Sequence, residues 1–140
     1  MKKIIIIIIS IVALLILSAC PEEIEHEFIY IKNNTDKEIR FVFSINKQDS
    51  NFYCSDNGKT IYLGVDSNST FNLQAGDAYS SWDGNLKLLT IFILDGEQYN
   101  KYWQQPCDTI RKYVPVLYTY RLTLADLQQM NWTVVYPPNN

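Results

Sequence analysis

The sequence predicts one mainly β domain, an antiparallel β-sandwich with short helices inserted in its second half. Behind residue 27, apolar side chains alternate with polar ones in several short runs, the period of a half-buried strand. Turn-forming Asn, Asp, Ser and Gly residues separate these runs. The 3 Trp, 10 Tyr and 6 Phe of the 140-residue chain also lie there, and aromatic residues favour strands and a bulky core.

The first two strands are predicted at residues 28–31 and 39–45. Asn-Asn-Thr-Asp at residues 33–36 is turn chemistry, so the two strands are expected to form a hairpin. The next two strands are expected at residues 60–63 and 70–73. Both are short, as is usual in a sandwich.

Residues 87–94 predict a strand buried on both faces, which favours a central position in a sheet. The alternation then stops, and residues 97–103 and 107–113 predict two short helices. Pro106 between them fits a helix start, because it lacks a backbone N–H. Strand character resumes at residues 117–122.

The end of the domain carries a helix signal and a last strand. Thr123 and Asp126 have the spacing of a capping box, which predicts one or two helical turns through Met130. Residues 132–136 predict the final strand. Trp132 begins that apolar strand and is therefore expected in the core.

The N-terminus predicts a cleaved leader. Lys2 and Lys3 precede residues 4–17, which are apolar apart from Ser10. This run is short for a membrane-spanning helix, which needs about 20 apolar residues, but suits a signal-peptide core of about 7–15. The following Leu17-Ser18-Ala19-Cys20 resembles the lipobox of bacterial lipoproteins. That resemblance implies cleavage before Cys20 and a diacylglycerol on its sulfur.

Three segments follow from this leader: a signal peptide at 1–19, a lipidated cysteine with an acidic tether at 20–27, and a single domain at 28–137. A solvated spacer is the simpler interpretation of the acidic tether, which also resembles the export signal of Bacteroidetes surface lipoproteins. Position 21 is Pro rather than Asp, so the enteric inner-membrane retention signal is absent. We expect lipid anchoring in the outer membrane, facing the periplasm or the cell surface.

Residues 87–136 resemble Bacteroidetes lipoproteins of unknown function. The segments that carry this likeness are residues 89–95, 99–102, 110–112, 120–127 and 130–133. The resemblance implies lineage and location only, and it carries no information on activity. The first half, with short strands and polar turns, resembles the opening of an immunoglobulin-like sandwich.

Charge and residue content exclude several functions. The chain behind residue 19 has 10 basic and 15 acidic residues, a formal charge of −5, so nucleic acid is not an expected partner. His26 is the only histidine and lies in the tether, where it cannot serve as a rigidly held base. Zinc ligands are too few, and no cofactor is expected. We predict no enzymatic activity. A small hydrolase that uses turn carboxylates is the alternative.

Cys54 and Cys107 are the two cysteines left after lipidation. An oxidising compartment makes a disulfide between them reasonable, and two separate thiols are the simpler expectation. Asp108-Thr109-Ile110 matches a short Bacteroidetes O-glycosylation pattern at Thr109. A helix-capping role for Asp108 or Thr109 is the simpler interpretation.

The candidate ligand-binding residues are aromatic: Trp82, Tyr99, Tyr102 and Trp103. Aromatic faces stack on sugar rings, so a glycan is one candidate partner and another protein is the second. Cover for the edge of the core is the simpler role for all four side chains. The sequence thus predicts a lipid-anchored, non-enzymatic binding or structural module.

Overall fold

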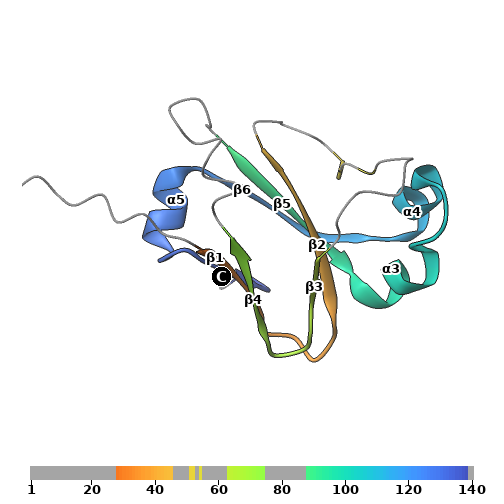
Figure 1. Ribbon diagram of the computed structural model, residues 1–140, viewed down its shortest axis with the longest axis horizontal. Coiled ribbons are helices and arrows are strands. Elements are labelled where there is room, and N and C mark those ends of the chain that lie inside the picture. Colours follow the sequence, from red (N-terminus) through yellow and green to blue (C-terminus); the bar gives the residue numbers. More distant parts are fainter. Residues whose placement is uncertain (1–27, 46–50, 53, 55–62, 75–87, 139–140) are drawn as a thin grey trace, which may run out of the picture.

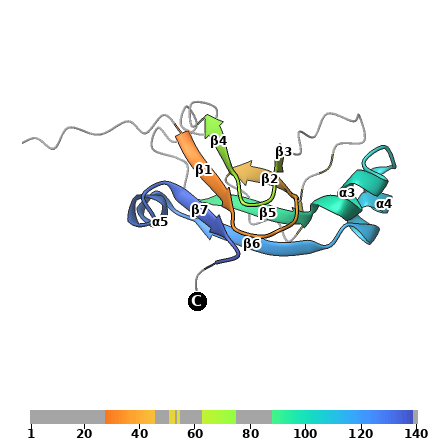
Figure 2. The ribbon, with the colours of Figure 1, turned by 90° about the horizontal axis from the view of Figure 1, so that it is seen from below.

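Two stacked β-sheets form the domain. The computed structural model describes residues 28–45, 51–52, 54, 63–74 and 88–138. The three-stranded sheet has the order β4 (Thr70–Gln74), β1 (Phe28–Asn33), β7 (Thr133–Tyr136), and the four-stranded sheet has the order β3 (Leu63–Val65), β2 (Ile39–Ile45), β5 (Leu89–Asp95), β6 (Val116–Leu122). Figures 1 and 2 show helices α3 (Gly96–Tyr102) and α4 (Cys107–Tyr113) beyond one end of the sheets and α5 (Leu124–Gln129) at the other. The mainly β prediction is confirmed.

The three-stranded sheet is mixed rather than wholly antiparallel. β1 pairs antiparallel with β4 on one side and parallel with β7 on the other. The other described strand pairs are antiparallel, because β2 pairs antiparallel with both β3 and β5, and β5 with β6. The prediction of an antiparallel sandwich is therefore wrong for the β1–β7 pair. The immunoglobulin-like arrangement stays a prediction.

The predicted hairpin of residues 28–45 is also wrong, because β1 and β2 lie in different sheets. The turn between them carries the chain across the sandwich. The connection from β3 to β4 crosses beside it, with hydrogen bonds from Asn33 N to Ser69 O at 2.9 Å and from Asn68 N to Thr35 O at 3.0 Å. Together β1–β2 and β3–β4 form one long antiparallel ribbon that is folded in half.

The Asn33 side chain holds this fold in the ribbon. It is fully buried, and its Nδ2 donates to the carbonyls of Lys37, Val65 and Asp66 at 2.7, 3.2 and 3.0 Å. Its Oδ1 accepts from the N–H and the hydroxyl of Thr35 at 3.0 and 2.7 Å. One amide thus joins both crossing connections, and it satisfies carbonyls that a buried turn would otherwise leave unpaired.

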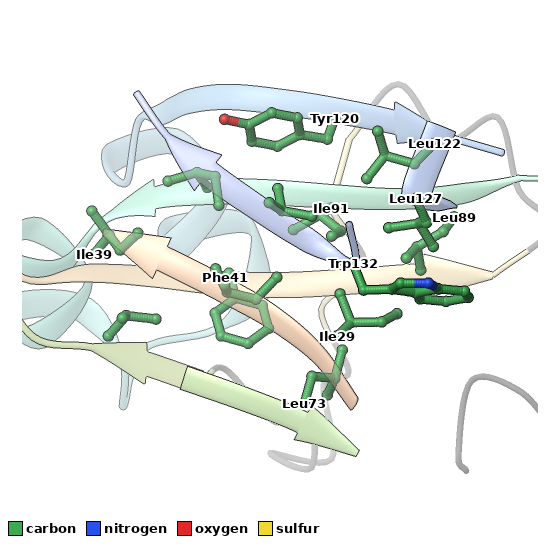
Figure 3. Close-up of a cluster of buried hydrophobic side chains, with 14 residues drawn as sticks. Ile29, Ile39, Phe41, Leu73, Leu89, Ile91, Tyr120, Leu122, Leu127 and Trp132 are labelled. Carbon is green, nitrogen blue, oxygen red and sulfur yellow. The ribbon is translucent and has the colours of Figure 1, made fainter. Parts of the chain in front are cut away.

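The main core lies between the two sheets (Figure 3). Alternate residues of each strand point inward, among them Ile29 and Ile31 from β1 and Ile91 and Ile93 from β5. Trp132 is 2% exposed and packs there, as predicted. The other buried members are Ile39, Phe41, Val65, Leu73, Leu89, Tyr120, Leu122, Leu127 and Val134.

A second core covers the other face of the four-stranded sheet. Phe92 and Leu94 of β5 pack there against α4, so β5 is buried on both faces, as its sequence predicted. The sulfurs of Cys54 and Cys107 are bonded within this cluster at 2.03 Å. The disulfide is therefore the alternative that holds, and it links Cys54 to the start of α4. The remaining buried members are Val42, Phe52, Ile110 and Val114.

Side-chain caps explain where α3 and α5 begin. The Asp95 carboxylate accepts from Gln98 N at 2.8 Å and starts α3, while Thr123 and Asp126 form the predicted capping box of α5. α4 begins after Pro106 without a side-chain cap, so the predicted capping role of Asp108 or Thr109 is wrong. None of the helices in the described ranges is long and apolar enough to cross a membrane.

The remaining strand predictions fit with small shifts. The strand expected at residues 60–63 appears as β3, which begins at Leu63, and residues 60–62 lie outside the described part. The other strands and helices begin and end within two residues of the predicted positions, and β1 continues two residues further than predicted, to Asn33.

Candidate functional site

A pocket of about 510 Å³ opens at the end of the sandwich that carries α3. We call it the end pocket. Its apolar side chains are Ile39, Leu117 and Tyr136. Its acidic side chains are Asp36, Glu38, Asp95 and Glu97, and Thr35, Lys37 and Asn100 complete the lining. The volume lies within the range of about 300–1,000 Å³ that small-molecule sites occupy.

The strand pairing brings these segments together. β2 and β5 are antiparallel neighbours, and Ile39 at the start of β2 lies opposite Asp95 at the end of β5. The turn before β2 and the first turn of α3 therefore meet at one edge of the sheet. Both contribute two carboxylates, because acidic residues stand at i and i+2 in each segment.

A β-bulge places Leu117 in the pocket. In the β5–β6 pairing, Ile93 lies opposite Tyr118 and Leu94 opposite Val116, so Leu117 is the extra residue on β6. A bulge of this kind turns a side chain out of the regular alternation. Leu117 is 39% exposed and contributes an apolar wall, whereas Ile39 is among the lining residues but is buried.

Two of the four carboxylates are held by cations. Glu38 pairs with Arg40 at 2.7 Å, and Asn100 connects the two by accepting from Arg40 and donating to Glu38, each at 3.0 Å. Glu97 pairs with Lys101 at 2.9 Å, and the hydrogen bond and charge of Lys101 lower the pKa of the Glu97 carboxyl.

The other two carboxylates keep unused acceptor capacity. Asp95 Oδ1 accepts from Gln98 N at 2.8 Å, which leaves most of the acceptor sites of a carboxylate free. The Asp36 carboxylate makes no hydrogen bond or ion pair with another residue of the described segments, and Asp36 is exposed. A ligand in the end pocket can thus be met by Asp36 and Asp95.

The aromatic candidates that the structure describes differ in exposure. Tyr99 is half-buried against the second core with the Arg40 guanidinium 5.7 Å from its ring centre, and burial raises the pKa of its hydroxyl. Tyr102 stacks on Tyr113 at 5.1 Å and 16°. Trp103 is 56% exposed at the end of α3. Trp82 lies outside the described residues.

The other candidate residues have separate positions. Thr109 is half-buried in α4, while Cys20 and His26 lie outside the described residues. Within the described ranges, no three His, Cys, Asp or Glu side chains are grouped so that they could hold a metal ion. Comparison of the chain with protein-family models, curated proteins and solved structures found no match.

The end pocket was not predicted from the sequence, although two pairs of acidic residues in the sequence belong to it. Asp36 and Glu38 precede one strand, and Asp95 and Glu97 follow or end another. Each pair separately is typical of turn and helix-start residues. Only the antiparallel pairing of β2 with β5 shows that both pairs lie at the same end of the sheet.

Proposed function

We propose that the protein is a lipid-anchored envelope protein that acts as a non-enzymatic binding module through its end pocket. The leader and Cys20 support an anchor in the outer membrane, facing the periplasm or the cell surface. The sandwich would carry the binding site at one of its ends, which is where variable immunoglobulin domains carry their binding loops. One observation carries the proposal: the end pocket begins at Thr35, just beyond the end of β1 that is away from Phe28, the first described residue of the domain.

The length of β1 gives this separation a scale. The strand spans Phe28–Asn33, and its six residues extend about 20 Å at roughly 3.3 Å per residue. The chain enters the domain at Phe28, while the pocket begins at Thr35, directly after the far end of the strand. An anchor at Cys20 would attach to the domain at the end away from the pocket and leave its opening accessible.

Binding fits the carboxylates better than catalysis does. A carboxylate hydrolase needs one carboxyl with a raised pKa to act as general acid. Lys101 lowers the pKa of Glu97, Glu38 is paired with Arg40, and Asp95 caps α3. Three of the four carboxylates thus have structural partners, which favours a recognition surface over a hydrolase.

Glycan binding at the α3–α4 surface is a second candidate function. Trp103 is 56% exposed and Tyr113 46% exposed. However, one face of Tyr113 is stacked on Tyr102, and the Lys112 ammonium lies 5.0 Å from its ring centre. The Trp103 indole is the aromatic face in this region that is best placed to stack on a sugar.

We expect small-molecule fragments to bind in the end pocket, which can be mapped by amide chemical-shift changes in the mature chain. The shifts should gather at Lys37, Glu38 and Asn100. Leu117→Ala removes part of the apolar wall. It should weaken fragment binding about five-fold, because the lost apolar contact corresponds to roughly 1 kcal/mol of binding free energy. Shifts confined to Trp103 and Tyr113 would instead support the glycan candidate.

Leu124→Ala is the matched control for this measurement. Leu124 is 41% exposed on α5, at the far end of the sandwich, and Leu117 is 39% exposed. Fragment affinity should be unchanged in Leu124→Ala. An equal loss in both variants would contradict a specific contribution of the pocket wall.

A further inference from the structure

We infer that the end pocket binds a lysine or arginine side chain of a protein partner. This inference rests on the proposed function and names the ligand class for the same site. It follows from three observations: the balance of charge in the lining, the apolar residues of the same lining, and the lack, among the described residues, of an acidic group that could hold a metal ion.

The charge balance favours a cation. The lining carries four carboxylates and one ammonium, that of Lys37. Arg40 and Lys101 lie beside Glu38 and Glu97 and offset their charge. The charges of Asp36 and Asp95 are then opposed only by that of Lys37. The net charge of the lining and its two neighbouring cations is therefore negative. A basic group placed between Asp36 and Asp95 would gain charge-assisted hydrogen bonds.

The apolar lining favours a cation on a hydrocarbon stem. Leu117 and Tyr136 offer surface on which methylene groups can pack while the charged end remains at the hydrated opening, and the buried Ile39 adds little to it. A metal ion has no use for this surface. The described acidic side chains also do not converge into a group that could coordinate a metal. A basic side chain satisfies both halves of the lining.

The ligand is expected to come from another molecule rather than from the N-terminal tether. Residues 20–27 contain four glutamates and no lysine or arginine, so an acidic pocket repels them. The tether also joins the domain at Phe28, the end of β1 away from the pocket. A partner with an exposed basic segment has the complementary charge.

The inference can be tested by titrating the full chain with a short peptide containing two lysines, and with the same peptide acetylated at both Nε atoms. Chemical-shift changes should gather at Lys37, Glu38 and Asn100. Acetylation should weaken binding about five-fold or more, because it removes the charge-assisted hydrogen bonds. Asp36→Asn should weaken binding of the unmodified peptide about three-fold at low salt, and less at high salt.

Asp108→Asn is the matched control, because it removes the same charge from a fully exposed side chain outside the pocket. It should leave binding unchanged. Equal affinity for the acetylated peptide, or equal losses in Asp36→Asn and Asp108→Asn, would overturn the inference. If neutral fragments bind in the pocket and lysine peptides do not, the ligand class is wrong and the proposed function stands. If neither binds there, both are wrong.

Discussion

Removal of the Cys54–Cys107 disulfide should lower the free energy of unfolding by about 4 kcal/mol. The bridge joins residues separated by 53 positions, and closing a loop of this length restricts the unfolded chain by roughly that amount in the chain-entropy model. Both cysteines are also buried in the second core beside Phe92 and Ile110. Thermal denaturation with and without reductant measures the effect, which should exceed about 10 °C in Tm.

A Cys54→Ala/Cys107→Ala variant provides the control. Its midpoint should match that of the reduced wild-type protein, and reductant should not move it further. Two free thiols in the unreduced wild-type protein, counted by mass spectrometry, would contradict the bridge.

Asn33→Ala should lower the free energy of unfolding by about 3 kcal/mol. The substitution removes the Asn33 amide donor from the buried carbonyl of Val65. The part-buried carbonyls of Lys37 and Asp66 lose the same donor. Loss of a partner for one buried polar group costs about 1–3 kcal/mol, and several such groups depend on this amide. Denaturant unfolding measures the change.

Asn34→Ala is the matched control, because Asn34 is the exposed neighbour of Asn33. Its effect should stay within about 0.5 kcal/mol. If the two variants lost equal stability, the amide of Asn33 would not be what holds the two crossing connections together.

The approximate position of each strand along the chain could be predicted from the sequence, but the pairing of the strands could not. The apolar run of β5 predicted burial on both faces, and Thr123 with Asp126 predicted the start of α5. Asn-Asn-Thr-Asp at residues 33–36 fits a hairpin turn as well as a crossing between sheets. What separates the two is a contact from Asn33 to the carbonyl of Val65, 32 residues away, and no local pattern contains it.

The candidate site was harder to predict for the same reason. Aromatic residues are easily recognised in a sequence, and they predicted a ligand site that included Tyr99 and Tyr102. Both side chains are partly buried against the second core. The end pocket is assembled from four separate segments, and each is ordinary alone. Leu117 reaches the pocket only because of a bulge, and the alternation of β6 gives no sign of it.

Fatty-acid labelling tests the proposed anchoring at Cys20 most directly. Cells that express the wild-type protein are grown with labelled palmitate, beside cells that express Cys20→Ser. The wild-type chain should carry the label, partition with membranes and begin at Cys20, whereas the variant should be unlabelled and absent from the membrane fraction. A Cys20→Ser protein that still carries labelled fatty acid and partitions with membranes would contradict the account.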